Sequence, residues 1–124
     1  MLQIILAIFL VLITIYIVPF IVYGVLSSLW SIKTPDGSPV LFLMSVFVSK
    51  AGTAITFVLI YYFAQAVFSS NWLLYTSLWL FMFIIGELGQ AIAPNYTFKE
   101  AIAGIISEVI YFPVSGYIIY SLIK

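Results

Sequence analysis

Charged side chains are absent from residues 1–32, the whole first quarter of this chain. A helix of that length, rising about 1.5 Å per residue, is longer than the roughly 30 Å hydrocarbon core of a bilayer. Over all 124 residues, 65% are hydrophobic and 6% are charged, whereas charged residues make up about a quarter of a soluble domain. The sequence therefore predicts an all-α membrane protein that crosses the bilayer several times.

Turn and capping residues divide the chain into four predicted transmembrane helices. We expect one domain over residues 1–124, with helices over about 2–30, 39–68, 71–93 and 98–123. Residues 34–37 are typical of a type I turn, and residues 69–71 leave room only for a tight reversal. Loops this short predict an antiparallel up-down bundle.

Four crossings predict that both termini lie on the same face of the membrane. The loops at Asp36 and Asn95 then lie on the opposite face, which also holds Lys33 and Lys99. The positive-inside rule favours a cytoplasmic location for these lysines, although Lys124 and the amino terminus nearly balance them. The sequence thus leaves the orientation open, with a lean towards termini outside the cytoplasm.

Lys50, Glu87 and Glu108 are charged residues inside the predicted spans. A charge at bilayer depth costs at least about 2.5 kcal/mol on insertion scales, so such residues usually face protein or line a pathway. Counted from the ends of their helices, the three lie at similar depth. We expect them to form one intramembrane polar cluster with Gln90 and Tyr111. Lys50 could pair with Glu87, pair with Glu108, or extend its amine towards the membrane surface.

Small residues in these helices are candidates for close helix packing. One small-residue stripe recurs every three to four positions and is expected to face the interior: Ser45, Ser49, Gly52 and Thr56. The other candidate packing residues are Gly86, Gly89, Gly104 and Ser107. Two prolines inside predicted helices are possible kinks, Pro19 and Pro113.

The residue types that this chain lacks exclude several kinds of chemistry. It has no Cys, His or Arg, so thiolate chemistry and the commonest zinc, copper and haem ligands are missing, and we expect no metal and no cofactor. Its formal charge is zero, which gives no basic surface for nucleic acid. No nucleophile–base pair accompanies the glutamates, so we expect no catalytic residues and no enzyme activity of its own, although the chain could belong to a membrane enzyme.

Two functions remain. The first is a structural or accessory subunit of a larger membrane complex, indicated by short loops, the absence of a soluble domain and several packing faces. Its partners would be the lipid bilayer and other transmembrane subunits. The alternative is a small proton- or cation-coupled transporter or channel, homo-oligomeric, that uses Glu108 and Glu87.

Overall fold

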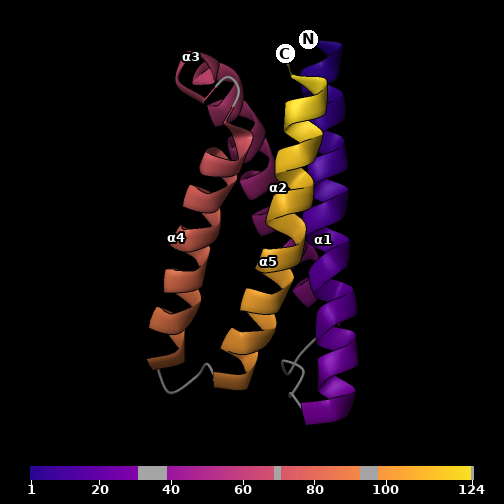
Figure 1. Ribbon diagram of the computed structural model, residues 1–124. Helices are drawn as coiled ribbons and strands as arrows, with labels where there is room; N and C mark the ends of the chain where they lie inside the picture. The colour runs from indigo at the N-terminus through magenta and orange to yellow at the C-terminus, as the bar shows by residue number, and fades with distance from the viewer. Residues whose placement is uncertain (31–38, 69–70, 93–97, 124) are drawn as a thin grey trace.

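The computed structural model describes residues 1–30, 39–68, 71–92 and 98–123. These residues are nearly all helical (Figure 1). The helices are α1 (Leu2–Trp30), α2 (Pro39–Phe63), α3 (Gln65–Phe68), α4 (Trp72–Ile92) and α5 (Phe98–Leu122). Four of them, all except α3, contain segments long and apolar enough to cross a membrane. The all-α class and the four candidate spans therefore agree with the sequence prediction, while the turn expected at 34–37 lies outside the described residues.

The helix expected over residues 39–68 is divided in the structure. α2 ends at Phe63, and the single-turn α3 follows Ala64. The backbone N–H of Phe68 donates to the carbonyl of Ala64 at 3.0 Å, and the side chain of Gln65 donates to the carbonyl of Ile123 at 3.3 Å. The change of direction therefore begins before residues 69–71, and a side-chain hydrogen bond ties α3 to the end of α5.

α5 is the most deeply buried of the four long helices. It contacts α1 on one side and α4 on the other, and α1 also contacts α2. Buried residues recur along one face of α5 at three- or four-residue intervals: Gly104, Glu108, Tyr111, Ser115 and Ile119. The start of α1 and the end of α5 lie at the same end of the molecule (Figure 1).

Aromatic side chains fill the space between α2, α4 and α5. The ring of Phe57 lies at the centre, with its centroid 5.2 Å from Tyr75, 5.5 Å from Trp79 and 5.7 Å from Phe112. The hydroxyl of Tyr75 also donates to the backbone carbonyl of Phe57, which links α4 to α2. We call these four residues the aromatic core.

The inward face of α2 differs from the one that the sequence predicts. Between residues 44 and 63, its buried side chains are Ala54, Phe57, Val58 and Tyr61. All four residues of the small-residue stripe are exposed, and a Cβ added at Gly52 would meet no atom within 4 Å. The expectation that this stripe packs inside the chain is therefore wrong. α2 turns Phe57 and Tyr61 inward, where their rings bury a large apolar area and contact rings of α4 and α5.

Candidate functional site

Two carboxyl groups meet where α4 packs on α5. Glu108 is buried, at 3% exposure, and its carboxyl shares a side-chain hydrogen bond with that of Glu87. An ionised carboxyl only accepts hydrogen bonds, so two carboxyls share one only when either of them carries a proton. In this arrangement, the carboxyl pair of Glu87 and Glu108 therefore shares at least one proton.

Gly104 makes room for this contact. A Cβ added at Gly104 would lie 2.5, 2.6 and 2.7 Å from Oε1, Cδ and Oε2 of Glu87. The carboxyl of Glu87 thus occupies the space that any larger residue at this position would fill. Gly104 precedes Glu108 by one helical turn, and residues at that spacing share a helix face. The missing side chain of Gly104 therefore lets Glu87 lie beside Glu108.

Lys50 reaches the same cluster from α2. Its Nζ atom lies 5.3 Å from the ring centroid of Tyr111, within the range of a cation–π interaction. The half-buried amine also interacts electrostatically with both carboxyls, more strongly with Glu108 than with Glu87. Of the alternatives left open by the sequence, the structure favours an amine that lies against α5 and interacts with Glu108.

Two polar atoms of this cluster are buried and have no hydrogen-bond partner among the described residues: Oε1 of Glu108 and the hydroxyl of Tyr111. Tyr111 is 0% exposed and interacts electrostatically with Glu108, Glu87 and Tyr23. A buried polar atom without a hydrogen-bond partner lowers the stability of the folded state. Native proteins therefore keep such atoms mainly where a water, an ion or a functional role explains them. These atoms mark the cluster as a place where a further polar partner would be stabilised.

Three residues of α4 do not take the positions that the sequence predicts. Gln90 is exposed, as are Gly86 and Gly89, and a Cβ added at either glycine would meet nothing within 4 Å. These positions contradict two expectations, that Gln90 joins the polar cluster and that the two glycines pack helices within this chain. Successive residues turn by about 100° around a helix, so a helix that points Glu87 at α5 points these neighbours away.

The remaining predicted residues lie within continuous helices. Ser107 is buried, and its hydroxyl donates to the carbonyl of Ala103 at 2.9 Å, so that it is satisfied inside α5. Pro19 and Pro113 lie inside α1 and α5, and both helices continue through them. A kink at either proline stays a prediction.

A second glycine contact on α5 was not among the predicted packing positions. A Cβ added at Gly116 would overlap Oγ1 of Thr76 and lie 3.1 Å from the Cβ of the same threonine and 3.0 Å from Cε3 of Trp72. The contacts of Gly104 and Gly116 lie about three turns apart along α5, and so do their partners along α4. The recurrence of small residues on α5 is the signal from which this second contact could have been found.

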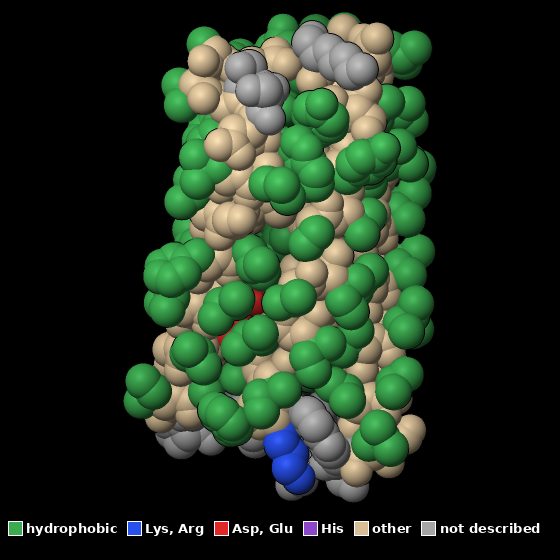
Figure 2. Space-filling model, in the orientation of Figure 1, with side chains coloured by type: hydrophobic (Ala, Val, Ile, Leu, Met, Phe, Trp, Pro, Cys, Tyr) green, Lys and Arg blue, Asp and Glu red, His purple; other side chains and the backbone are tan. Residues whose placement is uncertain are grey.

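The carboxyl pair is not sealed from the outer surface. Figure 2 shows acidic side-chain atoms between α4 and α5, surrounded by hydrophobic side chains. Glu87 is half-buried whereas Glu108 is buried. The side chain of Glu87 is therefore partly accessible from outside the chain.

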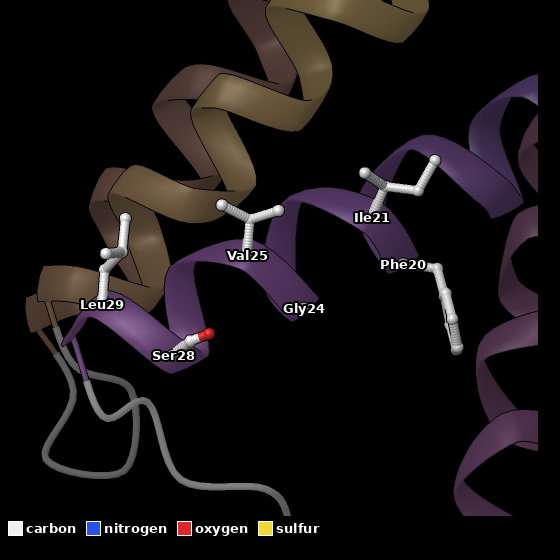
Figure 3. A pocket seen from close by; sticks show the side chains of 6 residues that line it. All are labelled: Phe20, Ile21, Gly24, Val25, Ser28 and Leu29. Atoms are coloured by element: carbon white, nitrogen blue, oxygen red, sulfur yellow. The ribbon is translucent and has the colours of Figure 1, made fainter.

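An open groove lies apart from this cluster, on the C-terminal half of α1 (Figure 3). It has a volume of about 480 Å³ and is lined by Phe20, Ile21, Gly24, Val25, Ser28 and Leu29. The hydroxyl of Ser28 is the single polar side-chain group among these lining residues, so the groove supplies no charged group for a ligand.

Comparison of the chain with protein-family models, with curated proteins and with solved structures found no match. Among the described residues, no group of three or more acidic, Cys or His side chains is placed to hold a metal ion.

Proposed function

We propose that this protein is a multi-pass membrane protein whose four long helices cross the bilayer as an antiparallel up-down bundle. Support comes from the four apolar segments and from the large apolar side chains that are exposed on every long helix, since lipid tails are a suitable environment for both. The lysine distribution favours, by a small margin, an orientation with both termini outside the cytoplasm.

Within the membrane, its proposed role is that of a structural or accessory subunit of a larger complex of transmembrane proteins. The observation that carries this proposal is the outward position of the small-residue stripe on α2. Small residues let the backbones of two transmembrane helices approach closely, and their hydroxyls can bond across the contact. Lipid tails cannot pack as closely against such a face or form hydrogen bonds with its hydroxyls. Gly86, Gly89 and Gln90 form a second outward group of this kind on α4.

The test is to isolate the full chain from gently solubilised native membranes and to identify co-purifying proteins by mass spectrometry. Gly52→Leu would fill the stripe, so we expect it to lose the partner that the unmodified chain retains. Gly24→Leu is the matched control, because Gly24 is also exposed and a Cβ there would meet nothing within 4 Å. A chain that purifies alone, as a stable monomer in native-like lipid, would contradict the accessory role.

Coupled transport is a second candidate, favoured by the contact between Glu87 and Glu108. Carboxyls within a membrane mark proton relays and ion pathways in many transporters. Four helices enclose little space, so this function would require a homo-oligomer. The test is flux of protons and monovalent cations into liposomes, where we expect Glu87→Gln and Glu108→Gln each to abolish it and Glu100→Gln, at the start of α5, to retain it. Undiminished flux in both of the first two variants would remove the carboxyl pair from transport.

A further inference from the structure

We propose that the carboxyl pair binds one monovalent cation in exchange for its shared proton, with the hydroxyl of Tyr111 as a further oxygen ligand. This inference rests on the second proposed function and names the ion that the pair would handle. It begins from the hydrogen bond between Glu108 and Glu87 and from the two buried oxygens beside it that have no hydrogen-bond partner among the described residues.

Charge balance sets the valence of the ion. In the proposed resting state, the pair holds one proton and one negative charge, which the charged amine of Lys50, in electrostatic contact with both carboxyls, balances. Loss of the proton leaves one uncompensated negative charge in apolar surroundings, which is strongly unfavourable. One monovalent cation restores neutrality, whereas a divalent ion would leave a net positive charge beside the lysine. The cluster is therefore neutral in two states, one with a proton and one with a monovalent cation.

The ligand atoms suit a hard cation. Glu87 and Glu108 supply carboxylate oxygens, and Oε1 of Glu108 and the hydroxyl of Tyr111 are the two atoms of this cluster that are buried without a hydrogen-bond partner among the described residues. Carboxylate and hydroxyl oxygens are the ligands that hard cations prefer. Tyr111 is fully buried and interacts electrostatically with both carboxyls, which places its hydroxyl in the same polar cluster.

Gly104 gives the pair freedom to open. The carboxyl of Glu87 rests on the bare backbone of Gly104, and a glutamate side chain has three rotatable bonds. The carboxyl can therefore shift over the glycine without meeting a side chain there, and an ion can enter between the two acids while the helices stay in place.

Carbodiimide labelling provides the test, because it reports the protonated carboxyl directly. A lipophilic carbodiimide adds the O–H of a carboxylic acid across one C=N bond, and the resulting O-acylisourea rearranges to a stable N-acylurea, with no other reagent and no by-product. The purified full chain would be labelled in lipid at fixed pH and fixed ionic strength, and the modified glutamate identified by mass spectrometry. Lithium, sodium and potassium chloride would each replace choline chloride in turn.

We expect labelling at Glu87 or Glu108 in choline, and at least one of the small cations to slow it. By mass action, the rate falls about tenfold at a cation concentration ten times the dissociation constant. Tyr111→Phe should raise the cation concentration needed for this protection, measured relative to the variant's own rate in choline. Tyr117→Phe, an exposed tyrosine on the same helix, is the control and should behave as the unmodified chain does.

Three results would overturn the inference: no labelling of either glutamate in choline, equal labelling in all four salts, or protection that is unchanged in Tyr111→Phe. The proposed transport function fails differently. Protection by a cation without any flux into liposomes would retain the binding site and remove transport. Flux that depends on both glutamates, with labelling insensitive to every cation, would retain transport and show that protons alone use the pair.

Discussion

Gly104 and Gly116 make equivalent contacts on α5, yet the atoms that face them differ in freedom of movement. The carboxyl of Glu87 lies at the end of a flexible side chain and can leave Gly104 by rotation. Oγ1 and Cβ of Thr76, which face Gly116, belong to a β-branched side chain whose rotamers in a helix are few. The same substitution at the two glycines should therefore have different effects, one on the carboxyl pair and the other on stability.

Gly104→Ala should separate the carboxyl pair at little cost in stability. The added methyl group occupies the position of the Glu87 carboxyl, which rotates away and loses its contact with Glu108. Infrared spectroscopy would show a shift in the carbonyl band of the protonated acid, while the free energy of unfolding changes by less than about 1 kcal/mol. Gly86→Ala, at an open position on α4, is the control and should leave the band unchanged. An unaltered band in Gly104→Ala would contradict the contact described here.

The inward positions of single residues could be predicted only in part from the sequence. Lys50, Glu87 and Glu108 stand out because a charge in lipid needs a partner, and the structure brings them near one another. Apart from Lys50, α2 has no charged residue that would indicate which of its faces contacts α4 and α5. Both sides of a transmembrane helix are apolar, so periodicity does not separate interior from lipid as it does in a soluble helix. The small residues around Gly52 suggested that their face of α2 points to the interior. In the structure, the face that carries the aromatic ring of Phe57 does so.

At the scale of helices, the contact between α4 and α5 is fixed near its two ends by the two glycines. Gly116→Ala should lower the free energy of unfolding by about 1–3 kcal/mol, the usual cost of overpacking. The added methyl group overlaps the side chain of Thr76 and lies close to that of Trp72, so both must shift away from α5. Chemical unfolding in detergent would measure it. Gly86→Ala again serves as the control, with an expected change within about 0.5 kcal/mol. Equal stability of the two variants would show that α4 does not pack closely on α5 at this point.

α2 joins α4 and α5 largely through the aromatic core. Phe57→Ala removes the ring that contacts Tyr75, Trp79 and Phe112 and should cost about 3–5 kcal/mol of unfolding free energy. Phe81→Ala is the matched control, since that ring is 67% exposed on α4 and its loss leaves no cavity. Thermal unfolding of both variants in the same detergent would compare them. Similar losses would mean that the core is not centred on Phe57.

At the scale of the whole molecule, the number of long helices and most of their ends could be predicted because turn and capping residues interrupt an otherwise apolar chain. The bounds of α1, α4 and α5 lie within a residue of those expected. α3 could not be predicted, because residues 64–68 continue the apolar pattern and their separate turn depends on a contact distant in sequence, between Gln65 and Ile123. Helix-to-helix contacts of this kind have no local sequence signal.

The topology proposed for the whole molecule gives the last prediction, and the absence of Cys makes it simple to test. Gln3 and Ser121 are exposed near the start of α1 and the end of α5, while Lys99 is exposed in the first turn of α5. In an antiparallel up-down bundle that spans the bilayer, a membrane-impermeant maleimide applied from one side should label Gln3→Cys and Ser121→Cys together. From the other side it should label Lys99→Cys alone. Labelling of all three from one side would contradict the four crossings, because an even number of spans returns the chain to its starting side and places the beginning of the last helix opposite.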